Sequence, residues 1–147
     1  MGPHCDQPIP SPRLLCDAML GGLARWLRAA GYDAAFAADI DDAELVRRAR
    51  HEGRTILSSD GRLFHRTALR RGEVPALWVP RQLSNSKGLE YVMNVLGLRR
   101  RPARCMGCGG ELREVPKHSV TAEAPPLAFR HCDRFWRCTR CEKLLWR

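Results

Sequence analysis

The chain has 147 residues, and its 25 lysine and arginine residues outnumber its 16 aspartate and glutamate residues, which gives a net charge of +9 at neutral pH. This excess of positive charge favours a polyanionic partner such as nucleic acid. The sequence contains neither an apolar run of roughly 18 residues nor an apolar segment after the first methionine, so we expect a cytoplasmic protein without a membrane span or a signal peptide.

The first third of the sequence predicts a leader, a strand and a helix. Residues 1–12 are rich in proline and lack periodicity, which indicates a flexible leader. The apolar run 13–16 predicts a short strand that ends at Asp17. Apolar residues at helical spacing then predict a helix, with Arg25 and Arg28 on its solvent side and Gly31 at its carboxyl end.

Strands and helices continue to alternate along the chain. We expect strands at 34–37, 55–59 and 75–80. We expect one helix that begins within 39–42 and ends near 51, a second that follows Asp60 and ends near 69, and a third around 89–96. This alternation is typical of an α/β fold with a parallel sheet flanked by helices, which binds its ligands beyond the carboxyl ends of the strands. We therefore assign residues 13–98 to an α/β domain, 99–104 to a basic linker and 105–147 to a second, smaller domain.

Several carboxylates are expected at one edge of this sheet. Asp17 and Asp60 each follow a strand, and either one alone is explained by a role as a helix N-cap. Together with the acidic residues at the start of the 42–51 helix they would repel one another unless a cation such as Mg²⁺ or Mn²⁺ bound there. Asp41 and Glu44 have the spacing of a capping box, whereas Asp42 shares a helix face with Leu45, Val46 and Ala49 and is expected to point toward the strand ends. Asp42 is therefore the preferred third ligand, with Glu44 second and Asp39 third.

The last third of the sequence contains two Cys-x-x-Cys pairs, Cys105/Cys108 and Cys138/Cys141. Four thiolates in this arrangement are typical of a structural Zn²⁺ site in a zinc ribbon. Two disulfides or a thioredoxin-type redox site are the alternatives, and the long connection between the pairs also offers His131 and Cys132 as substitute ligands. The remaining cysteines, Cys5 and Cys16, are interpreted as small apolar residues.

The same region combines arginines with aromatic residues. Arginine side chains neutralise phosphates, and aromatic rings stack on unpaired bases. We expect Trp136 and Trp146 to form the small core of the ribbon, whereas the arginines are the candidates for contact with nucleic acid: Arg134, Arg137 and Arg140.

Five segments together resemble the Mut-seven C-terminal RNase domain family. They are Leu15-Cys16-Asp17-Ala18-Met19-Leu20-Gly21-Gly22-Leu23-Ala24-Arg25-Trp26-Leu27-Arg28, Gly31-Tyr32-Asp33, Asp42-Ala43-Glu44-Leu45, Leu57-Ser58-Ser59-Asp60-Gly61-Arg62-Leu63, and Phe135-Trp136-Arg137-Cys138 with Cys141. The resemblance implies a PIN-like nuclease domain followed by a zinc ribbon, and a ribonuclease that hydrolyses RNA with Mg²⁺ or Mn²⁺. It further implies that Asp17, Asp42 and Asp60, with Glu44 in reserve, hold the catalytic metal, and that Arg25 and Arg62 contact the RNA.

Two other functions fit parts of the sequence. A non-catalytic RNA-binding adaptor would use the basic ribbon and arginines without the carboxylates, and metal-dependent cleavage of RNA separates it from a nuclease. A phosphotransfer enzyme with Asp17 as nucleophile would require a second aspartate two positions later, where the chain has Met19.

Overall fold

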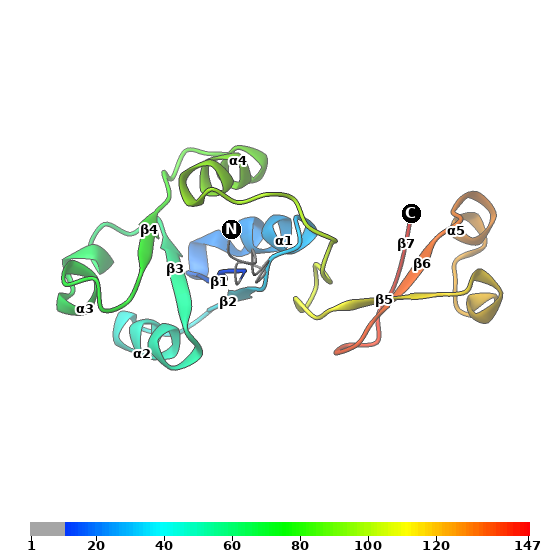
Figure 1. Cartoon of the computed structure of the whole chain (residues 1–147), viewed down its shortest axis with the longest axis horizontal. Helices are drawn as coiled ribbons and strands as arrows, with labels where there is room; N and C mark the ends of the chain where they lie inside the picture. Colours follow the sequence, from blue (N-terminus) through cyan, green and yellow to red (C-terminus); the bar gives the residue numbers. More distant parts are fainter. Residues whose placement is uncertain (1–10) are drawn as a thin grey trace, which may run out of the picture.

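The computed structural model describes residues 11–147, so most of the predicted leader, with Cys5, lies outside the described residues. The described chain forms a four-stranded parallel sheet covered by helices and a separate three-stranded antiparallel sheet that begins after the last large helix (Figure 1). The predicted fold class, a parallel α/β sheet flanked by helices and followed by a small C-terminal unit, is confirmed. No helix in residues 11–147 has the length and apolar character to cross a membrane.

The parallel sheet has the strand order β2-β1-β3-β4. Leu15 at its centre pairs with Ala35 on one side and with Ile56 on the other. Such apolar residues form strands here because the sheet is buried on both faces. The bounds are β1 Arg13–Cys16, β2 Ala34–Phe36, β3 Arg54–Ser58 and β4 Ala76–Trp78.

Helices cover both faces of this sheet. Alternate side chains of β1 point to opposite faces, so Leu14 packs with α1 and α4, whereas Leu15 packs with α2. The side chains of Asp41 and Ser84 cap α2 and α4 by accepting from backbone N–H groups. The helices and helical turns are η1 Ala18–Leu20, α1 Gly21–Ala29, α2 Asp42–Glu52, η2 Leu63–His65, α3 Thr67–Arg70 and α4 Asn85–Leu96.

The burial of Cys16 and Arg28 can be compared with what their sequence positions predicted. Cys16 is fully buried, and burial raises the pKa of its thiol to about 12, which confirms its interpretation as a small apolar residue. Arg28 was expected on the solvent side, and this was wrong because it is buried. It lies one helical turn after the buried Ala24, on the face of α1 that meets the second unit, where its charge is compensated by backbone carbonyls.

The second unit is a β-ribbon with strands in the order β5-β6-β7. Its small core consists of Phe135 and Val120 with Phe129 beside them, and it excludes the two tryptophans that were expected to form it. Trp136 follows Phe135 in β6, so it lies on the opposite face of the ribbon and is only half-buried, whereas Trp146 pairs with Phe135 at the end of the edge strand β7 and is exposed. The bounds are β5 Leu112–Val115, η3 Lys117–Val120, α5 Pro126–His131, β6 Phe135–Cys138 and β7 Leu144–Trp146.

Residues 99–104, predicted as a linker, lie against the carboxyl end of α1. Their backbone N–H groups at Arg101 and Arg104 donate to carbonyls of Ala30 and Arg28 at 2.9 and 2.8 Å. Gly31 makes this contact possible, since its φ of +99° suits glycine and a Cβ there would lie 2.5 Å from Arg101 Cβ. The connection therefore positions the ribbon instead of letting it swing freely.

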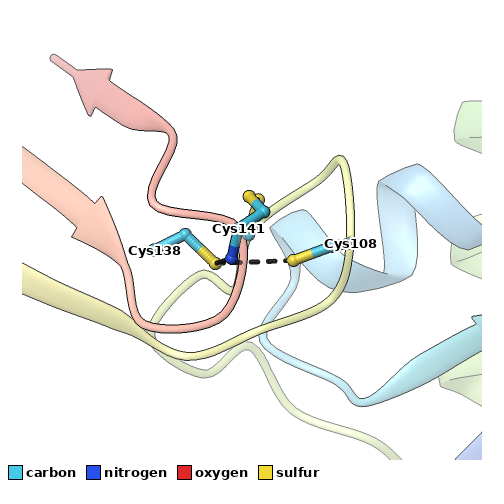
Figure 2. A group of neighbouring side chains, drawn as sticks. Cys108, Cys138 and Cys141 are labelled. Carbon is cyan, nitrogen blue, oxygen red and sulfur yellow. Dashed lines mark hydrogen bonds between the residues drawn. The ribbon is translucent and has the colours of Figure 1, made fainter.

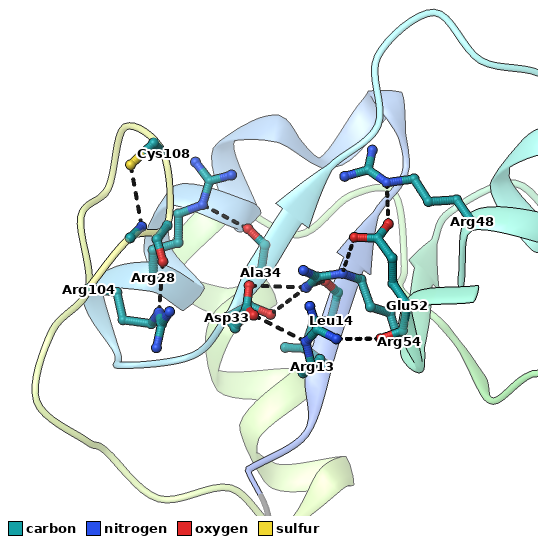
Figure 3. A network of polar contacts seen from close by, with 12 residues as sticks. Arg13, Leu14, Arg28, Asp33, Ala34, Arg48, Glu52, Arg54, Arg104 and Cys108 are labelled. Atoms are coloured by element: carbon teal, nitrogen blue, oxygen red, sulfur yellow. Dashed lines mark hydrogen bonds and ion pairs between the residues drawn. The ribbon is translucent and has the colours of Figure 1, made fainter. Parts of the chain in front are cut away.

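A network of ion pairs occupies the amino edge of the parallel sheet (Figure 3). The buried Arg54 side chain contacts Asp33 at 3.1 Å and Glu52 at 3.2 Å. Burial raises the pKa of Asp33 and of Glu52, but hydrogen bonds from Arg54 and from neighbouring arginines outweigh it and hold both pKa values below the ordinary range. These two carboxylates are thus neutralised by the protein itself.

We expect this network to make stability depend on acidity. Because the folded pKa values of Asp33 and Glu52 are lowered, their contribution is present above their ordinary pKa values and is lost as the pH falls through the folded values. Arg54→Met should lower the free energy of unfolding at neutral pH by about 3 kcal/mol and flatten its acid dependence. Urea denaturation from neutral pH to about pH 3 measures both effects. The matched control Arg50→Met breaks only the exposed pair with Glu73 and should change stability by less than about 1 kcal/mol; equal losses in both variants would contradict the prediction.

Candidate functional site

Asp17 and Asp60 follow the carboxyl ends of β1 and β3, which are neighbours in the sheet. The chain leaves β1 toward β2 on one side and later returns to β3 on the other, so these two strand ends flank the switch point of the topology. Loops diverge at such a point and leave a crevice, which is where parallel α/β sheets bind their ligands. Both side chains are partly exposed there.

Ser58 connects the two aspartates. Its hydroxyl donates to Asp17 Oδ2 at 2.7 Å and accepts from the backbone N–H of Asp60 at 3.0 Å. The remaining bonds are local, since Asp17 Oδ1 accepts from the N–H of Ala18 and Asp60 Oδ1 accepts from the N–H of Arg62. Asp17 therefore acts as an N-cap through Oδ1, as expected, while its Oδ2 is held at the end of β3 by Ser58.

The charge around this pair differs from that at the opposite edge of the sheet. Asp33 and Glu52 are paired with arginines, whereas within residues 11–147 no lysine or arginine lies within 4.0 Å of a carboxylate oxygen of Asp17 or Asp60. Two partly exposed carboxylates without a cationic partner are suited to binding a cation from solution.

Asp42 and Glu44 lie in the first turn of α2, outside the Asp17–Ser58–Asp60 hydrogen bonds. Asp42 Oδ2 is 3.8 Å from Arg66 Nε, and Glu44 pairs with Arg47 on the surface. Asp41 caps α2 by accepting from the N–H of Glu44, which is half of the expected capping box. In the described part of the chain, Asp17, Asp42 and Asp60 do not form a group close enough to share one ion, so Asp42 as third ligand stays a prediction.

The neighbouring polar residues have different roles. The Ser59 hydroxyl donates to the carbonyl of Val79 at 2.6 Å and is buried, so it stabilises the end of β4. Arg62 is exposed beside Asp60, and its side chain extends into solvent. It stays a candidate for contact with a phosphate.

The four cysteines of the Cys-x-x-Cys pairs meet at the base of the ribbon, and Figure 2 labels three of them, Cys108, Cys138 and Cys141. Their sulfur atoms all lie within 4.8 Å of one another, with 3.4 Å between Cys108 and Cys138 and 3.8 Å between Cys105 and Cys141. Four cysteine sulfurs this close are positioned to hold a metal ion such as Zn²⁺ with no open coordination position, which is a structural site. His131 and Cys132 are not part of the cluster, because α5 carries them to the other end of the ribbon, where Cys132 packs near Phe135.

The backbone prepares this cluster for a metal ion. Burial raises the pKa of Cys138, but backbone N–H groups of Cys141 and Arg140 donate to its sulfur and lower the pKa to about 6. Burial raises the pKa of Cys108 to about 11, and a hydrogen bond to the neighbouring sulfur adds to this. A thiol deprotonates when it coordinates a metal, so the lowered pKa favours the Cys138 thiolate that coordination requires, whereas the raised pKa of Cys108 means that a bound metal ion has to displace its proton.

Arg28 joins the cysteine cluster to the α/β domain (Figure 3). Its guanidinium donates to the carbonyls of Ala34, Met106 and Gly107 at 2.8, 2.9 and 3.2 Å. Gly109, with a φ of +79°, leaves room for this side chain, since a Cβ there would lie 3.2 Å from Arg28 Nε. This role of Arg28 was not predicted, although its spacing of four residues from the apolar Ala24 places both on the same face of α1.

The arginines predicted to bind nucleic acid are largely engaged within the protein. Arg134 forms a two-pronged pair with Glu114 and stacks on Trp136, while Arg137 pairs with Glu123. Arg140 donates to the carbonyl of Cys108 at 3.1 Å. Arg25 is exposed on α1, and no side chain of residues 11–147 pairs with it.

Comparison with known proteins adds two findings. Residues 12–147 match the family model described as the Mut7-C RNAse domain. The chain is also 35% identical over 106 residues to a human protein named Exonuclease mut-7 homolog, an alignment that covers 69% of this chain and 12% of that protein. The chain therefore corresponds to a small part of this relative.

Proposed function

The chain belongs to the Mut7-C RNAse domain family. On this basis we propose that it is a divalent-metal-dependent ribonuclease that hydrolyses phosphodiester bonds of single-stranded RNA. The family match and the similarity to an exonuclease homologue support a nuclease-type function. The metal dependence and the preference for single-stranded RNA are our proposal.

The observation that carries this proposal is the pair of aspartates at the switch point. Asp17 and Asp60 are connected through Ser58 and lack a cationic side-chain partner within the described chain. Carboxylate oxygens are the donors that Mg²⁺ and Mn²⁺ prefer, so this pair fits such an ion. Asp42 lies apart from the pair and would have to move toward it to serve as the proposed third ligand. When bound, the ion would supply an activated water and charge stabilisation on the phosphate oxygens.

Hydrogen bonds within the protein orient the two aspartates for this reaction. The Ser58 hydroxyl holds one oxygen of Asp17 and thereby orients the carboxylate before any ion binds. The backbone of the turn after β3 fixes Asp60 through the N–H of Arg62. The exposed Arg62 side chain extends from the same turn and is proposed to contact the scissile phosphate, which is the role of a positioned cation.

A cleavage assay with controlled metal content tests the proposal. We expect the purified protein to degrade a labelled single-stranded RNA with Mg²⁺ or Mn²⁺, to stop with EDTA and to recover when excess Mg²⁺ is restored. The zinc content must be measured before and after chelation, because loss of zinc would unfold the ribbon and also stop cleavage. Cleavage that continues with zinc retained and Mg²⁺ removed would contradict metal dependence. RNA binding without cleavage under any metal would instead favour the adaptor function.

A further inference from the structure

An open pocket of about 290 Å³ lies between α1 and the ribbon, away from the two aspartates. It is lined by Arg25 of α1, by Met106 and Gly107 of the first cysteine turn, and by the segment at β7, namely Lys143, Leu144, Leu145 and Trp146. The pocket thus exists only while the ribbon is docked on α1, and the buried Arg28 beneath it makes that contact through the carbonyls of Met106 and Gly107.

The side chains of this pocket combine an aromatic face with two available cations. Trp146 is 42% exposed although it is a large apolar residue. Arg25 and Lys143 are exposed, and within residues 11–147 no carboxylate lies within 4.0 Å of either, in contrast to Arg134 and Arg137 on the same ribbon. The aromatic ring and both cations are therefore free to meet a ligand.

An exposed aromatic ring beside unpaired cations matches one nucleotide of a single strand. The ring stacks on an unpaired base regardless of its identity, and the cations neutralise the adjacent phosphates. A duplex cannot present its base faces in this way. Along the chain, α1 and the turn before it connect the pocket to Asp17 over eight residues, on the order of 12 Å, so one strand can reach both.

We propose that this pocket is a binding site for a nucleotide of single-stranded RNA, with the base on Trp146 and the phosphates on Arg25 and Lys143. The inference rests on the proposed nuclease function, because the pocket would bind the same RNA strand that is cleaved at Asp17 and Asp60. It places the selection for single strands at the junction of ribbon and α/β domain, and not on the arginines already paired within the ribbon.

Equilibrium binding tests this site independently of catalysis. In an Asp17→Asn background, fluorescence anisotropy with a fluorescein-labelled oligouridylate should show that Trp146→Ala weakens affinity about tenfold, whereas Trp146→Phe retains most of it. The double variant Arg25→Gln/Lys143→Gln should weaken binding and reduce the slope of log affinity against log salt by about 1.4, since each phosphate contact on a single strand contributes about 0.7. The matched controls are Arg130→Gln and Leu127→Ala, which change an exposed cation and an exposed apolar side chain on α5 of the same ribbon and should leave affinity close to that of the parent.

The outcomes separate the two proposals. Unchanged affinity in the Trp146→Ala and double variants, with zinc content retained, would overturn the pocket while cleavage by the parent protein still supported a nuclease. Equal affinity for a duplex of the same length would also overturn it, because stacking on Trp146 requires an unpaired base. Loss of binding in these variants together with a parent protein that never cleaves RNA would support the pocket and contradict the nuclease proposal.

Discussion

Asp17→Asn and Asp60→Asn should each reduce RNA cleavage at least about 100-fold while the protein stays folded. Asparagine keeps the oxygen that accepts from the N–H of Ala18 or of Arg62, and it is as good an N-cap as aspartate, so the local turns are preserved. The charge that attracts a divalent ion is lost. Initial cleavage rates at several Mg²⁺ concentrations, with circular dichroism as a measure of folding, check the expectation.

The control is Asp41→Asn, which changes another N-cap aspartate, at the start of α2, and leaves Asp17 and Asp60 in place. We expect it to retain nearly full activity. Asp42→Asn should have a smaller effect than Asp17→Asn, because Asp42 already faces Arg66 and lies outside the hydrogen bonds of Ser58. Full activity in both the Asp17 and the Asp60 variants would exclude these carboxylates as the catalytic centre.

Cys138→Ser or Cys105→Ser should abolish zinc binding and unfold the chain beyond about residue 103. The ribbon has a core of only a few side chains around Phe135, so its folding free energy comes largely from metal binding, which is about 10–16 kcal/mol for small zinc domains. The α/β domain should remain folded, because its two apolar clusters do not depend on the ribbon. Elemental analysis should give one zinc per chain in the parent, and limited trypsin digestion should remove the unfolded part of the variants.

Cys132→Ser is the matched control for the zinc site. It changes a cysteine of the same ribbon that packs near Phe135 and lies outside the sulfur cluster. It should keep one zinc per chain and its resistance to trypsin, with only a small loss of stability. Zinc should also dissociate as the pH falls, because protons compete with it for the four cysteine sulfurs, which bind zinc only as thiolates. A parent protein without zinc, or a Cys138→Ser variant that retains it, would show that the cluster is not a zinc site.

The sequence predicted those features that depend on short-range patterns. Apolar runs identified β1 and β3, and Asp17 and Asp60 were placed at their ends because a strand followed by a helix leaves a polar residue at the junction. The Cys-x-x-Cys spacing identified the four sulfurs that meet in the fold, since two residues between cysteines place both sulfurs on one turn. Asp41 was recognised as a cap from the residue three positions later.

Other features depended on contacts that no local pattern contains. Arg28 was expected in solvent because a charged residue is normally exposed, but the docked ribbon supplies carbonyls that compensate its burial. The tryptophans were expected in the ribbon core because they are large and apolar, yet Phe135 occupies that core and leaves Trp146 at the pocket beside α1.

Short-range patterns in the sequence thus determined the helices and strands, the strand ends that carry Asp17 and Asp60, and the cysteine ligands. Each of these features depends on residues only a few positions apart. The tertiary structure alone decided which charges are paired and which are free. Arg54 lies beside Asp33 and Arg134 beside Glu114, while Asp17, Asp60 and Arg25 have no such partner in residues 11–147, because ion pairs form between segments that only the folded chain brings together.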